Sequence, residues 1–219
     1  DWGSGLALLD GKRMPGAKWF PDAKLNFAAN LLRHRDATEA LVFVGERCER
    51  RSLTYQQLYH EVARVAQGLR AVGVVAGDRV AGFLPNIPEA AVAMLATASI
   101  GAIWSSCSPE FGVNGVIDRF GQIEPKVLFT ADGYFYGGKT LDSLGLVATV
   151  VSRIASIQQV IVIPFVQSSP ELSAVPSSIL FERFGTSATA IDFAMLPFDQ
   201  PLYILYSSGT TGVPKCIVH

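Results

Sequence analysis

Residues 206–215 read Tyr-Ser-Ser-Gly-Thr-Thr-Gly-Val-Pro-Lys and gather groups that could hold a phosphate. Four hydroxyl residues and two glycines occupy positions 207–212, and a lysine follows at position 215. Glycines let the backbone turn its N–H groups toward one point and let an anion approach closely, because they carry no Cβ. Hydroxyls add hydrogen-bond donors, and the lysine adds a positive charge. The pattern predicts a polyphosphate-binding turn made of Ser207, Ser208, Gly209, Thr210, Thr211, Gly212 and Lys215.

The same composition fits an ordinary solvated turn, since Ser, Thr and Gly are common in surface loops. The turn, however, directly follows residues 202–206, an apolar run with the character of a strand. Ligands of α/β proteins bind at the carboxyl ends of parallel strands, so this placement favours phosphate binding. The segment is not a Walker A loop, because its glycines are too closely spaced and Cys216 follows the lysine.

The elements that would position this turn begin with a clear helix. Thr54 and Gln57 have the spacing of a capping box, in which each side chain satisfies a free backbone N–H of the first turn. Apolar residues then recur at steps of three and four as far as Val72. Gly73 can adopt the left-handed conformation that ends a helix.

The rest of the chain alternates short β-branched runs with helical patterns. The expected elements are a strand at 79–84, a buried helix through Ile100 with Asn86 as its cap and Pro88 in its first turn, a strand at 102–105, a helix near 113–123, a strand at 127–130, a helix near 141–154, a strand at 160–163 and a last strand at 202–206. Apolar strands separated by helices imply right-handed crossovers. We therefore predict an α/β fold with a mostly parallel sheet and helices on both faces, preceded by a short antiparallel hairpin at 41–54. Residues 167–178 are expected to form a surface loop.

Composition narrows the possible partners. Eighteen basic and nineteen acidic residues give a formal net charge of −1, which supplies no field for nucleic acid or an anionic membrane. The longest apolar run, residues 90–103, is shorter than the ~20 residues that a membrane-spanning helix needs. Cys48, Cys107 and Cys216 lie far apart, so they predict neither a disulfide framework nor a metal site. We expect a cytoplasmic protein with small-molecule partners.

Residues 207–215 closely resemble the phosphate-binding signature of the AMP-forming acyl-CoA synthetases, a family of adenylate-forming enzymes. Residues 19–27, 85–90, 103–112 and 118–126 resemble one branch of that family, the acetoacetyl-CoA synthetases. The resemblance extends from about residue 16 to residue 219. The departures are small: Ala29 stands where the branch usually has Glu, and Cys216 stands where Gly or Ala is commoner.

The resemblance implies a two-step reaction with ATP, Mg²⁺ and coenzyme A. A carboxylate, acetoacetate in this branch, attacks the α-phosphorus of ATP to give an acyl-adenylate and pyrophosphate, and the thiol of coenzyme A then displaces AMP. The predicted turn matches the residues that wrap the β- and γ-phosphates, with Thr211 and Lys215 in catalytic roles. Residues 108–112 match a region near coenzyme A, although a plain loop between strand and helix is the simpler interpretation. Trp104 is expected to be a core residue.

Relative to the family, residues 1–219 are expected to form only an incomplete AMP-binding N-terminal domain, without the C-terminal domain. The contacts to adenine, ribose, magnesium and the acyl group would lie later, so we expect no ligase activity from the chain alone. A sheet that ended at residues 202–206 would leave an apolar edge open, which predicts poor solubility. Two alternatives stay open: another short-chain acyl-CoA synthetase, and a non-catalytic nucleotide-binding module.

Overall fold

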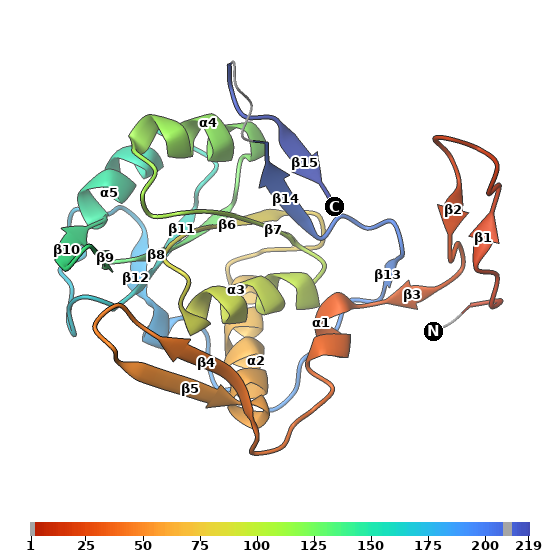
Figure 1. Cartoon of the computed structure of the whole chain (residues 1–219), viewed down its shortest axis with the longest axis horizontal. Coiled ribbons are helices and arrows are strands. Elements are labelled where there is room, and N and C mark those ends of the chain that lie inside the picture. The colour runs from red at the N-terminus through yellow and green to blue at the C-terminus, as the bar shows by residue number, and fades with distance from the viewer. Residues whose placement is uncertain (1–2, 208–211) are drawn as a thin grey trace.

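A seven-stranded sheet forms the centre of the computed structural model, which describes residues 3–207 and 212–219 (Figure 1). In chain order its strands are β6 (Arg79–Phe83), β7 (Ile103–Cys107), β8 (Val127–Ala131), β11 (Gln159–Ile163), β12 (Ser178–Leu180), β14 (Tyr203–Tyr206) and β15 (Cys216–Val218). Their order across the sheet is β12-β11-β8-β6-β7-β14-β15. All neighbours run parallel except β14 and β15, which are antiparallel. The predicted mostly parallel sheet is confirmed.

Helices cover both faces of the sheet (Figure 1). One face carries α2 (Tyr55–Ala71) and α3 (Pro88–Ser99), and the other carries α4 (Val113–Ile123) and α5 (Leu144–Arg153). Successive side chains of a strand point to opposite faces, so Leu128 packs with α4 and α5 while Phe129 packs with α2 and α3. Both side chains are fully buried, which explains why the strands are apolar throughout. None of the helices in residues 3–207 and 212–219 is long and apolar enough to cross a membrane.

The start and the end of α2 follow the predicted signals. The Thr54 hydroxyl accepts a hydrogen bond from the Gln57 backbone N–H at 3.1 Å, and the Gln57 side-chain oxygen accepts one from the Thr54 N–H at 2.9 Å. This reciprocal pair is the predicted capping box. Gly73 follows the helix with φ +78°, a conformation that glycine adopts without strain.

Two predicted helix starts are wrong. Ile87, not Asn86, is the N-cap of α3, and no side chain caps it; Pro88 is the first helical residue, as expected. The helix predicted near 141–154 begins at Leu144, because the preceding residues form a hairpin between β9 (Gly133–Tyr136) and β10 (Lys139–Asp142). Pairing with a neighbouring strand overrides the weak helical pattern of Leu141 and Asp142, and Ser143 is the N-cap of the helix.

The expectation of an open edge beside residues 202–206 is also wrong. β15 pairs along β14, with Ile204 opposite Val218 and Tyr206 opposite Cys216. The edges of the described sheet are therefore β12 and β15. Leu205 and Ile217, which face each other across this pair, remain 49% and 43% exposed.

Smaller elements surround the sheet. The hairpin predicted at 41–54 is present as β4 (Glu39–Val44) and β5 (Arg50–Thr54). Of the loop predicted at 167–178, residues 167–177 form neither helix nor strand, but Ser178 begins β12. The remaining elements are β1 (Leu8–Leu9), β2 (Lys18–Trp19), β3 (Lys24–Leu25), α1 (Phe27–Leu31), the 3₁₀ helix η1 (Phe181–Arg183) and β13 (Leu196–Pro197). Figure 1 shows β1 and β2 standing apart from the central sheet, on the side of β3 and β13.

Candidate functional site

The predicted phosphate-binding turn is the connection of the hairpin formed by β14 and β15. Ser207 and Lys215 close it: the Ser207 N–H donates to the Lys215 carbonyl at 3.0 Å, and the Lys215 N–H donates to the Ser207 hydroxyl oxygen at 3.2 Å. The turn leaves the carboxyl end of β14, a parallel strand, which is the edge where α/β sheets bind ligands. The structure thus brings the first and last predicted residues of the turn together.

Of the predicted site residues, Ser207, Gly212 and Lys215 are among the described residues. Gly212 lies between the two ends of the turn with φ +90°, where a side chain would be strained. Lys215 is exposed. The remaining predicted residues, Ser208, Gly209, Thr210 and Thr211, lie outside the described residues.

Helix α4 contacts this hairpin through a residue that the sequence did not single out. The Gln122 side-chain amide donates to the Pro214 carbonyl oxygen at 2.8 Å. The two residues are 92 positions apart. No local pattern could have predicted this contact, because it depends on how α4 lies across the sheet.

A group of side chains lies along β7 and β14 on the α4 face of the sheet. The Ser105 hydroxyl hydrogen bonds the Ile204 carbonyl at 2.8 Å and the Tyr206 hydroxyl at 2.9 Å. Burial raises the pKa of the Tyr206 phenol well above its ordinary value, more than the Ser105 hydrogen bond lowers it. Burial likewise raises the pKa of the Cys107 thiol to about 12. Both groups are neutral near pH 7, so neither supplies a base or a nucleophile there.

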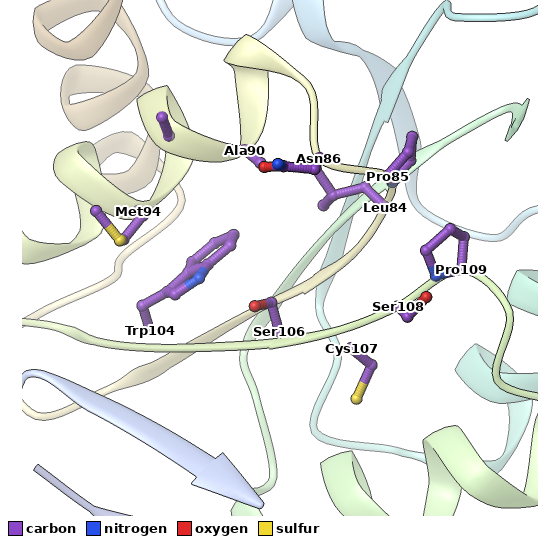
Figure 2. A pocket seen from close by; sticks show the side chains of 11 residues that line it. Leu84, Pro85, Asn86, Ala90, Met94, Trp104, Ser106, Cys107, Ser108 and Pro109 are labelled. Carbon is purple, nitrogen blue, oxygen red and sulfur yellow. The ribbon is translucent and has the colours of Figure 1, made fainter. Parts of the chain in front are cut away.

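A cavity of about 440 Å³ opens at the carboxyl ends of β6 and β7 (Figure 2). The chain leaves β6 toward α3 on one face and leaves β7 toward α4 on the other, so the cavity lies at a point where the connections diverge. Figure 2 shows Trp104 and Met94 on one side of the cavity and Ser108 and Pro109 on the other. Its polar groups come from Asn86, Ser106 and Ser108.

Trp104 belongs both to the hydrophobic core and to the wall of the cavity. It is only 6% exposed and belongs to the core beneath α2 and α3, which confirms the prediction of a core residue. Its indole also lines the cavity. The loop at 108–112 contributes Ser108 and Pro109 to the same cavity, so the described structure gives this loop a ligand-sized space beside it.

The described residues hold no group of three or more His, Cys, Asp or Glu side chains that could bind a metal ion. Cys48, Cys107 and Cys216 are free thiols.

Comparison with known proteins gives consistent matches. Residues 27–219 match the AMP-binding enzyme family. The chain is 50% identical over 216 residues to an acetoacetyl-coenzyme A synthetase of Rhizobium meliloti, which covers 97% of this chain and 33% of that protein. It is 41% identical over 219 residues to a malonamoyl-CoA synthetase of Penicillium aethiopicum, covering 94% of this chain and 30% of that protein.

A solved structure also matches this chain over nearly its whole length. The acetoacetyl-CoA synthetase of Streptomyces lividans superposes with a TM-score of 0.90 at 46% identity, covering 97% of this chain and 32% of that protein. The chain therefore spans about a third of the length of these relatives.

Proposed function

The chain belongs to the AMP-binding enzyme family, and from that premise we propose that it is part of an ATP-dependent acid–CoA ligase that activates acetoacetate. The observation that carries the proposal is the 50% identity to an acetoacetyl-coenzyme A synthetase over 97% of the chain. Because the chain spans about a third of that relative, the activity belongs to a longer protein and the chain by itself is expected to be inactive.

The proposed reaction has two steps. First, an oxygen of the acetoacetate carboxylate bonds to the α-phosphorus of ATP, and the bond from that phosphorus to the bridging β-phosphate oxygen breaks. The products are an acyl-adenylate and pyrophosphate. Second, the sulfur of coenzyme A bonds to the acyl carbonyl carbon, the thiol proton passes to solvent, and AMP leaves with the electrons of the broken carbon–oxygen bond.

The turn at 207–215 is assigned to the leaving pyrophosphate. Negative charge develops there in the first step, and preorganised N–H and hydroxyl donors stabilise it without reorganisation cost. Support comes from the closure of the turn by Ser207 and Lys215 at the carboxyl end of β14. Thr211 and Lys215 are the proposed catalytic residues, and Ser207, Ser208, Gly209, Thr210 and Gly212 the further phosphate-binding residues. Mg²⁺ would neutralise phosphate charge, and we assign it no ligand in the described part of this chain.

The cavity at the carboxyl ends of β6 and β7 is assigned to coenzyme A. Its lining is largely apolar with hydroxyl and amide groups from Ser106, Ser108 and Asn86, which suits a thin amide-bearing chain such as the pantetheine arm. Replacing Ser106 by Val in a full-length ligase should raise KM for coenzyme A and leave KM for ATP unchanged. Equal changes in both would remove the assignment.

ATP–pyrophosphate exchange on a full-length ligase carrying this chain tests the activity. With acetoacetate, acetate and butyrate as acids, we expect the highest kcat/KM for acetoacetate. Exchange that is faster with acetate or butyrate would redirect the proposal to another short-chain synthetase. Nucleotide binding without exchange for any acid would favour a non-catalytic module.

A second substrate is supported by the malonamoyl-CoA synthetase that is 41% identical to this chain. Malonamate has the shape of acetoacetate with an NH₂ group in place of the terminal methyl group, which makes its carbonyl an amide. A pocket that accepts the methyl group would leave the amide N–H donors without partners, which disfavours malonamate. Adding malonamate to the exchange assay separates the two acids, since a malonamate ligase would prefer it over acetoacetate.

The proposed location is the cytoplasm, where Cys48, Cys107 and Cys216 would remain free thiols. The formal net charge of −1 is consistent with small-molecule partners alone. Immunofluorescence of the tagged protein would test the location.

A further inference from the structure

The contact between Gln122 and Pro214 is directed at one peptide group of the phosphate turn. Gln122 lies in the last turn of α4, and its side-chain N–H reaches the Pro214 carbonyl oxygen at 2.8 Å. That carbonyl belongs to the peptide joining Pro214 to Lys215. The same peptide's N–H, which is that of Lys215, donates to the Ser207 hydroxyl oxygen at 3.2 Å.

The peptide before Lys215 is therefore held at both ends. Gln122 holds its oxygen, and Ser207 holds its N–H. The Lys215 carbonyl, one peptide further on, accepts the Ser207 N–H at 3.0 Å. Since these bonds fix the planes on either side of the Lys215 Cα, they set the direction in which its side chain leaves the backbone.

A second contact shows that α4 lies against the hairpin rather than touching it at one atom. Arg119 is three residues before Gln122 and thus on the same face of the helix. Its guanidinium carbon lies 5.7 Å from the centre of the Tyr206 ring and 4.1 Å from that of Phe111. Arg119 meets the β14 end of the turn, and Gln122 meets the β15 end.

We propose that Gln122 is a positioning residue that aims Lys215 at the phosphates of the nucleotide. The inference rests on the proposed function, because it assumes that Lys215 contacts those phosphates. Donors help a charged transition state most when they are already oriented, so a hydrogen bond that never touches the nucleotide can still affect the rate. Among the described residues, the Gln122 side chain makes no other hydrogen bond to the turn; its second acceptor is the Asp118 carbonyl within α4.

The first arm of the test measures the backbone directly, in the chain itself and without activity. Gln122→Met keeps the length of the side chain and removes the donor. Hydrogen exchange of the Lys215 amide, followed by NMR, should become about 2–10-fold faster, as expected for the loss of one exposed hydrogen bond. The matched control is Gln159→Met, which removes a 2.6 Å bond from a glutamine side chain to the Ser177 carbonyl at the far edge of the sheet. It should leave Lys215 exchange unchanged.

The second arm is a double-mutant cycle in a full-length ligase. Gln122→Met should lower kcat/KM for ATP about 5–10-fold, again the value of one hydrogen bond, and leave KM for the acid unchanged. In a Lys215→Ala background the same substitution should have no further effect on kcat/KM, because there is no ammonium group left to aim. Its effect on thermal stability should be the same in both backgrounds.

The outcomes separate the two proposals. If Gln122→Met leaves Lys215 exchange unchanged, or lowers kcat/KM equally with and without Lys215, the positioning role is wrong whatever the activity of the enzyme. If Lys215 exchange responds but the wild-type enzyme shows no ATP–pyrophosphate exchange, the proposed function fails, and with it the nucleotide as the target of Lys215.

Discussion

The indole ring of Trp104 lies across Gly82, its diagonal neighbour on the adjacent strand. A Cβ atom added to Gly82 would sit 2.6 Å from Cζ2 of Trp104 and 2.7 Å from Cη2. Gly82 pairs with Ser106 in the β6–β7 ladder, two residues after Trp104. The absent side chain of Gly82 thus makes the space in which the indole forms one wall of the cavity.

Gly82→Ala should therefore displace Trp104. Because the indole is 6% exposed and packed on Phe129, it has little room to move, and we expect a loss of about 1–3 kcal/mol in the free energy of unfolding. Chemical denaturation followed by tryptophan emission reports both the stability and the displaced ring.

The matched control is Gly121→Ala in helix α4, where the nearest atom to a new Cβ, Cγ2 of Ile117, is 3.9 Å away. Gly121→Ala should raise the free energy of unfolding by about 0.5–1 kcal/mol, since alanine favours a helix more than glycine does. A Gly82→Ala protein with unchanged stability and emission would show that the ring does not depend on the glycine.

Removal of a donor from the phosphate turn should slow adenylation. Lys215→Ala, or Thr211→Ala, in a full-length ligase is expected to reduce the rate of ATP–pyrophosphate exchange by about 10²–10³, the usual cost of one preorganised donor to a developing anion. Lys12→Ala, which removes an exposed lysine outside the turn, serves as the control. Exchange at the wild-type rate in both turn variants would remove these residues from the site.

Cys107 should resist thiol reagents that modify Cys48. Burial raises the pKa of Cys107 to about 12, so at pH 8 almost none of it is the reactive thiolate, whereas Cys48 is exposed. Titration with a disulfide reagent and mass mapping should show Cys48 modified first and Cys107 only after unfolding. Modification of Cys107 as fast as Cys48 would mean that the strand opens readily.

The same raised pKa predicts a loss of stability at high pH. The folded state holds the proton of Cys107 more tightly than the unfolded state, so this contribution is complete below the ordinary thiol pKa of about 9 and declines between about pH 9 and 12. Cys107→Ala should make the free energy of unfolding fall less steeply over that window. An unchanged slope would assign the alkaline loss to other groups, Tyr206 among them.

Local signals predicted much of the scaffold. Thr54 and Gln57 located the start of α2, because a capping box involves only residues three positions apart. Leu141 was wrongly placed in a helix because residues 139–142 pair with 133–136, and periodicity does not reveal a strand partner. β15 was missed for a related reason: three residues are too few to show a pattern, and they form a strand only beside β14.

The candidate site likewise has a part that the sequence predicts and a part that only the structure reveals. The residue types at 207–215 and their place after an apolar strand predict a phosphate-binding turn, and its role stays a prediction. What the structure shows is that Ser207 and Lys215, at its two ends, are joined by hydrogen bonds. Gln122 could not be found from the sequence, since its contact with Pro214 spans 92 residues. Local chemistry identifies the groups that would contact a ligand, but the residues that hold those groups in place emerge only from tertiary packing.

Asp132 is such a supporting residue elsewhere in the fold, and its loss should destabilise the sheet. Its carboxylate is fully buried just beyond β8 and accepts the backbone N–H groups of Phe165, Val166 and Gln167 at 2.7, 2.9 and 2.8 Å. Asp132→Asn would replace one acceptor oxygen by an N–H₂ group that faces a donor.

A buried donor left without a partner costs about 1–3 kcal/mol, so we expect that loss in the free energy of unfolding of the Asp132→Asn protein. Asp132→Ala, which frees all three N–H groups, should lose more. Urea denaturation compares these variants with Asp199→Asn, an exposed aspartate whose change should stay within about 0.5 kcal/mol. Equal stability of the asparagine variants at 132 and 199 would mean that residues 165–167 find other acceptors when the carboxylate is gone, and that the end of β8 is held by apolar packing alone.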